Sequence, residues 1–177
     1  MREIKKEERI MNYTSAQAAK LLSKLQQDYD VIAAREENAK TFPASLGEDV
    51  ESVRPEYNYA ETKAALAELE AKIRKVKHAV NVFNTVTVVP EFDMTIDEML
   101  VYIPQLSKKK AKLRGMADAL PKERVRSFER SNIVDYKYVN YDLEAVKADL
   151  DAVTEELSAA QIALDSVNHA LEFGIDI

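Results

Sequence analysis

The stretch LEAVKADLDAVTEELSAAQIALDSVNHAL, residues 143–171, decides the fold. Its apolar residues recur in strict alternation, three and then four positions apart: Leu143, Val146, Leu150, Val153, Leu157, Ala160, Leu164, Val167 and Leu171. This repeat predicts a long helix with one narrow apolar seam, as in a coiled coil. The outer positions are mostly acidic: Glu144, Asp149, Asp151, Glu155, Glu156, Asp165 and Glu172.

Three further segments have helical periodicity, and two of them begin with a capping box. Thr14 with Gln17 predicts a helix over residues 15–40, and Thr95 with Glu98 predicts one over residues 96–120. Asn58 caps a third, which continues to residue 84 with a heptad seam. We therefore expect a mainly α fold of four long helices with coiled-coil packing.

Two short segments are typical of β-strands. TVTVV at 85–89 is β-branched and ends at Pro90, and residues 133–139 alternate so that Tyr136 and Tyr138 share one face. Because a strand is not stable alone, we predict a small two-stranded element that pairs 85–89 with 133–139.

The predicted domain organisation is simple. Residues 1–13 are assigned to an N-terminal extension, and residues 14–177 to a single helical-bundle domain. Lys6, Glu7 and Glu8 can be encoded by a purine-rich stretch that resembles a bacterial ribosome-binding site. One hypothesis is therefore that translation starts at Met11; the alternative is a charged extension of the chain.

Composition narrows the functional classes. The chain has 177 residues, a net charge of −6 and no cysteine, so disulfides and cysteine chemistry are excluded. No apolar run approaches the length of a membrane span, and we expect a cytoplasmic protein without stable membrane insertion. The charge is uneven, because the segment 108–130 holds nine basic and three acidic residues. An acidic partner surface would fit that segment.

Little in the sequence points to catalysis. The three glycines are scattered, which excludes a phosphate loop, and His78 and His169 lack the spacing of a metal site. We therefore predict no catalytic, cofactor or metal residues and no enzymatic activity. Asn81, Asn84 and Asn168 fall near the ends of two seams. They are either a polar layer that fixes register or binds a ligand, or helix-capping residues.

The basic run has two interpretations. Its members are Lys108, Lys109, Lys110, Lys112 and Arg114. They could face the acidic side of the last helix, within one chain or across a homo-oligomeric interface. Alternatively, they could bind single-stranded nucleic acid together with Tyr136 and Tyr138. The excess of acid elsewhere in the chain favours the first interpretation.

Several short motifs resemble a known family. VFNTVTVV, the capped helix MTIDEMLVYIPQLSKKKAKL, RSNIVDYKYVNYDLEAV and the closing DSVNHALEF are similar to small helical bacterial proteins labelled septicolysin. The resemblance covers roughly residues 58–177. The family carries an Asn-Trp pair where this chain has Asn168 and His169. The resemblance implies a helical fold, and the family name implies a cytolysin.

Three functional hypotheses follow. The first is a non-enzymatic coiled-coil assembly or protein-interaction module, which forms homo-oligomers or binds an acidic protein surface because its seams leave apolar surface to share. The second is a nucleic-acid-binding protein that uses the segment 108–130 with Tyr136 and Tyr138. The third is a membrane-active, cytolysin-like protein that rearranges its amphipathic helices.

Overall fold

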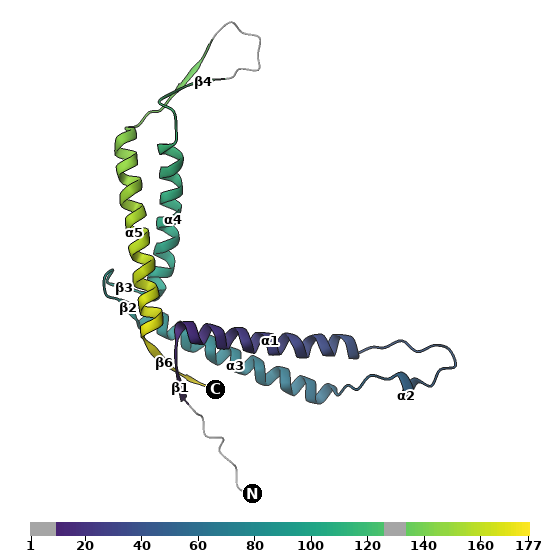
Figure 1. The fold of residues 1–177 in the computed structure, drawn as a ribbon. Helices are drawn as coiled ribbons and strands as arrows, with labels where there is room; N and C mark the ends of the chain where they lie inside the picture. The colour runs from purple at the N-terminus through teal and green to yellow at the C-terminus, as the bar shows by residue number, and fades with distance from the viewer. Residues whose placement is uncertain (1–9, 126–133) are drawn as a thin grey trace. The chain divides into compact units, whose positions relative to one another are not determined.

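The computed structural model describes residues 10–125 and 134–177 and confirms a mainly α fold (Figure 1). The elements in chain order are β1 (Ile10–Thr14), α1 (Ser15–Ala39), α2 (Val50–Val53), α3 (Tyr59–Val86), β2 (Val88–Val89), β3 (Met94–Thr95), α4 (Ile96–Ala117), β4 (Lys122–Arg124), β5 (Tyr136–Tyr138), α5 (Leu143–Ala170) and β6 (Glu172–Asp176). The four predicted long helices are α1, α3, α4 and α5. The described residues form two compact units, 10–86 with Asn168–Ile177, and Thr87–Val167.

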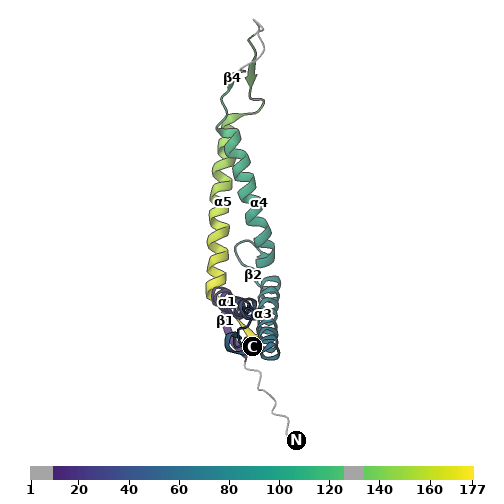
Figure 2. The same cartoon turned by 90° about the vertical axis from the view of Figure 1, so that its right-hand side faces the viewer.

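The first unit is a hairpin of α1 and α3, which lie side by side in both ribbon views (Figures 1 and 2). The predicted capping box starts α1, because Thr14 accepts a hydrogen bond from the Gln17 amide and the Gln17 side chain accepts one from the Thr14 amide. Ala18 and Val76 are fully buried where the two helices meet. The seams of α1 and α3 thus form one narrow core.

A strand pair that the sequence did not predict covers this core. β1 and β6 are antiparallel, with Tyr13 opposite Phe173 and Asn12 opposite Gly174. Ile175 is fully buried against the helix seam. A Cβ at residue 174 would lie 2.9 Å from the Ile10 Cγ2 atom, so glycine allows the two strands to approach closely. Residues 10–13 of the predicted extension therefore form a strand, and the predicted seam position Leu171 lies just after α5.

The second unit contains α4 and the greater part of α5, which run side by side in both views (Figures 1 and 2). Thr95 and Glu98 form the predicted capping box at the start of α4. Met99, Leu106 and Leu113 are buried at intervals of seven residues. On α5, six buried residues are positions of the predicted repeat, Ala163 is buried beside them, and Leu143 and Leu150 are only half-buried. The six are Val146, Val153, Leu157, Ala160, Leu164 and Val167. One seam therefore joins the two helices.

The predicted pairing of 85–89 with 133–139 is wrong. Val88–Val89 pairs with Met94–Thr95, and Tyr136–Tyr138 pairs with Lys122–Arg124. Residues 85–86 belong to α3, and Ile133 lies outside the described residues. β2 and β5 each pair with a strand nearby in sequence. Closing a short loop costs less entropy than closing one of more than forty residues. In the turn between β2 and β3, Asp93 takes a left-handed conformation with φ 51°.

Candidate interaction surfaces

The basic run on α4 is distributed around the helix. A helix turns by about 100° per residue, so Lys108 and Lys112 lie on one face, directed away from the buried Leu106 and Leu113. Lys109 and Arg114 flank the seam on opposite sides and are exposed, whereas Lys110 is half-buried. The five cations therefore do not form one strip. We call the outward surface of Lys108, Lys112 and the 57% exposed Val101 the basic face.

In the described part of its own unit, the basic face forms no ion pair with an acidic side chain. Among the described residues, no ion pair involves a cation of α4, although α5 carries many carboxylates. On α5, Asp151 and Glu155 are exposed on the side away from the buried Val153. Ile162, 67% exposed, lies on the same side. We call this surface of α5 the acidic face.

Two hydrogen bonds show how α4 aligns with α5 and with Tyr141, which lies two residues before α5. The Tyr102 hydroxyl donates to Glu156 Oε1, and the Tyr141 hydroxyl donates to the Met116 carbonyl at 2.9 Å. The hydrogen bond to Glu156, with a smaller contribution from burial, raises the pKa of Tyr102. Because the helices are antiparallel, moving one residue forward along α4 corresponds to moving one residue backward along α5. Lys108 is therefore level with Leu150, next to Asp151.

A second surface is the ribbon of β4 and β5, at the end of α4 (Figure 1). The register pairs Lys122 with Tyr138 and Arg124 with Tyr136. The Tyr136 and Tyr138 ring centroids are 6.5 Å apart, and the Lys122 Nζ atom lies 4.1 Å from the Tyr136 centroid and 5.5 Å from the Tyr138 centroid. The two tyrosines thus share a face, as the alternation predicted, and the register adds two cations that the sequence pattern had not placed there.

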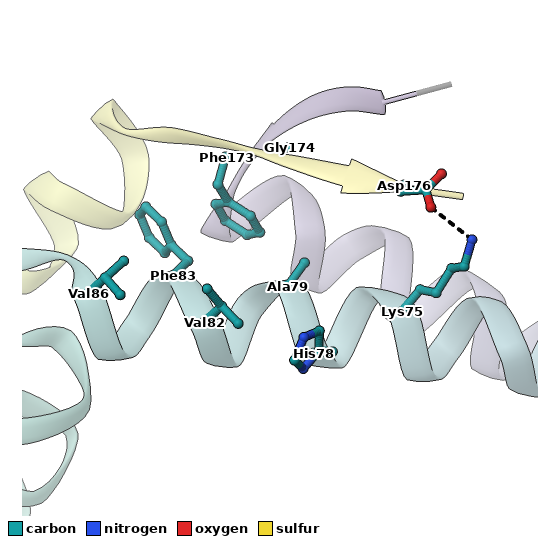
Figure 3. Close-up of a pocket in the computed structure, with 9 residues that line it drawn as sticks. All are labelled: Lys75, His78, Ala79, Val82, Phe83, Val86, Phe173, Gly174 and Asp176. Carbon is teal, nitrogen blue, oxygen red and sulfur yellow. Dashed lines mark hydrogen bonds and ion pairs between the residues drawn. The ribbon is translucent and has the colours of Figure 1, made fainter. Parts of the chain in front are cut away.

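A groove of about 460 Å³ runs between α3 and β6 in the first unit (Figure 3). Val82, Val86 and the stacked rings of Phe83 and Phe173, with centroids 4.4 Å apart, make its apolar part. The Lys75 Nζ atom lies 3.0 Å from Asp176 Oδ2 at its polar end. His78 also lines the groove. This open site suits an apolar side chain more than a reacting substrate.

The three predicted seam asparagines differ in exposure. Asn81 is exposed on α3, while Asn84 and Asn168 are half-buried in the last turns of α3 and α5. No side-chain hydrogen bond joins any two of them in the part of the chain that the structure describes. Both interpretations of these asparagines, a polar layer and helix capping, stay predictions.

Within residues 10–125 and 134–177, no group of three or more His, Asp or Glu side chains could hold a metal ion. No helix in those residues combines the length and apolar character that crossing a membrane requires.

The fold defines a helical protein built from two helix hairpins, and comparison with known proteins supports that class. No family model and no curated protein matches the chain. The chain is similar to a crystal structure of a functionally unknown conserved protein from Corynebacterium diphtheriae, with a TM-score of 0.58 and 20% identity. The match covers 92% of this chain and 99% of the other. At this identity the likeness shows the fold alone, and the resemblance to septicolysin stays a prediction.

Proposed function

We propose that the protein is a non-enzymatic self-assembly and interaction module, in which the basic face of one copy binds the acidic face of another. The observation that carries this proposal is that the second unit has exposed lysines on the outer side of α4 and exposed carboxylates on the outer side of α5. Lys108 and Lys112 have no ion pair among the described residues, although Asp151 and Glu155 belong to the same hairpin. Opposite charges on opposite sides of one body favour head-to-tail association between copies.

The alignment of α4 and α5 supports a specific register for this association. Lys108 is level with Leu150, so two hairpins placed side by side in the same direction bring Lys108 of one copy to Asp151 of the next. Exposed apolar side chains, Val101 on the basic face and Ile162 on the acidic face, add contact area. Because the two faces differ, the contact is heterologous and builds rings or open chains.

A charge-swap experiment tests the proposal. We expect Lys108→Glu and Asp151→Lys each to weaken self-association measured by light scattering and sedimentation, and the double variant to restore it. Exposed charge pairs contribute about 0.2–1 kcal/mol each, so several contacts per interface are needed and high salt should dissociate the assembly.

Lys20→Glu is the matched control, because Lys20 is also an exposed helical lysine but lies on α1. It should leave association unchanged. A wild-type protein that stays monomeric at 100 mM salt and high concentration would overturn the proposal. So would a double variant no better associated than either single variant.

A further inference from the structure

The β4–β5 ribbon has two chemically different faces. Cross-strand partners in an antiparallel pair point to the same side, so Lys122, Arg124, Tyr136 and Tyr138 share one face. Glu123 and Lys137 form a directly opposed pair on the other face and offset each other in charge. We call the face formed by Lys122, Arg124, Tyr136 and Tyr138 the aromatic face. It carries two cations and no carboxylate.

The rings on this face are not used to build a core. Tyr136 is 46% exposed and Tyr138 is 61% exposed, although a tyrosine on a strand normally packs against neighbouring elements. The ring planes are inclined by 49° and their centroids lie 6.5 Å apart. Two rings are therefore presented to solvent, with the Lys122 ammonium group lying over one face of each and leaving the opposite faces for a stacked base.

Single-stranded nucleic acid fits this combination better than other anionic partners. Unpaired bases stack on aromatic rings, and cations beside those rings bind the backbone phosphates. An acidic peptide would use the cations but leave the rings without flat partners. A duplex would also fail to use the rings, because its bases are stacked on each other.

We propose that the aromatic face of the β4–β5 ribbon binds single-stranded nucleic acid. Tyr136 and Tyr138 each stack one base, and Lys122 and Arg124 bind the phosphates that flank those bases. The contact is independent of base sequence, because ring stacking uses the faces of the bases rather than their edges. The site is separate from the basic and acidic faces that carry the proposed self-association.

Fluorescence anisotropy of the full chain with labelled oligo(dT) and oligo(U) tests this proposal. Binding should be strongest at low salt. Tyr136→Ala with Tyr138→Ala should weaken affinity by at least about fivefold per ring, the lower limit of measured base stacking on aromatic side chains. Tyr136→Phe with Tyr138→Phe keeps both rings and should retain affinity. Lys122→Gln with Arg124→Gln should reduce the slope of log affinity against log salt by about 1.4, for two phosphates on a single strand.

Lys137→Gln is the matched control, because it removes a cation from the opposite face of the same ribbon. It should lower affinity far less than Lys122→Gln alone. The proposal fails if no oligonucleotide binds at 50 mM salt, or if the tyrosine-to-alanine variant binds as tightly as wild type. Equal loss on Lys137→Gln and Lys122→Gln, or equal binding of polyglutamate and oligo(dT), would also overturn it. Lys108→Glu should leave oligonucleotide affinity nearly unchanged, which separates this test from that of self-assembly.

Discussion

The two units use the same kind of helix seam but differ in what surrounds it. In the first unit, several cations form ion pairs within the unit: Lys72 Nζ lies 2.8 Å from Glu68 Oε1, and Lys75 Nζ lies 3.0 Å from Asp176 Oδ2. The strands β1 and β6 cover the seam of α1 and α3. In the second unit, the cations of α4 have no ion pair among the described residues.

The difference is therefore between a unit in which several helix cations are paired and a unit in which the cations of α4 are not. A narrow seam between two helices buries few side chains, so each hairpin needs either a cover or a partner. The β1–β6 pair supplies a cover for the first unit. The second unit has instead outward faces of opposite charge, which is the reason for placing the proposed contacts there.

The largest expected effect concerns the cover. Ile175→Ala should lower the free energy of unfolding of the first unit by about 2–4 kcal/mol, because Ile175 is fully buried against Ala18 and Val76. Urea denaturation measures the loss, and hydrogen exchange should show faster opening in α1 and α3 than in α4.

The control is Ile162→Ala at a concentration where both variants are monomeric. Ile162 is 67% exposed, so the same change should cost less than about 0.5 kcal/mol. If Ile162→Ala destabilised the protein as much as Ile175→Ala, burial under the β1–β6 pair would not account for the effect of Ile175→Ala.

The sequence predicted the helices well because their signals are local. The capping boxes at Thr14 and Thr95 and the apolar repeat of α5 each depend on spacings of a few residues. The structure contains both boxes and buries six of the nine predicted positions of the repeat. The β6 strand was missed because FGID is short, contains a glycine and follows a helix without a break. The alternation of Phe173 and Ile175 was the available signal, and the long heptad before it obscured that signal.

Strand partners could not be predicted from the same information. A β-propensity pattern shows that a segment is extended, but the partner depends on loop closure and on which edge is within reach. KER at 122–124 has no β-branched or aromatic residue, so nothing marked it as the partner of Tyr136–Tyr138. The aromatic face therefore became visible only with the register, while its two tyrosines were predicted to share a side.

The helix caps allow a smaller, matched comparison of the two units. Thr95→Ala removes the acceptor for the Glu98 amide at the start of α4, and Thr14→Ala removes the equivalent acceptor for the Gln17 amide in α1. Each should cost about 1 kcal/mol. Denaturation followed by hydrogen exchange should assign each loss to its own unit. Destabilisation of both units by either variant would show that the hairpins unfold together.

The smallest expected effect is a difference between the two capping boxes in how their contribution to stability depends on pH. Hydrogen bonds from the Thr95 amide and hydroxyl hold the pKa of Glu98 below its ordinary value of 4.5. A carboxyl group whose pKa is lower in the folded state stabilises the fold above its unfolded pKa, and that contribution is lost as pH falls through the folded value. The α1 box uses Gln17, which does not titrate.

Glu98→Gln should therefore remove part of the acid sensitivity of α4. The stability difference between wild type and Glu98→Gln, measured by urea midpoint, should favour wild type at pH 6 and shrink steadily below pH 4.5. Gln17→Glu is the reciprocal variant. It should make the contribution of the α1 capping box to stability depend on pH in the acid range, which it does not do with Gln17. A wild-type advantage over Glu98→Gln that stays constant from pH 6 to pH 3 would mean that the charge of Glu98 contributes nothing to its cap. The two boxes would then be equivalent despite their different side chains.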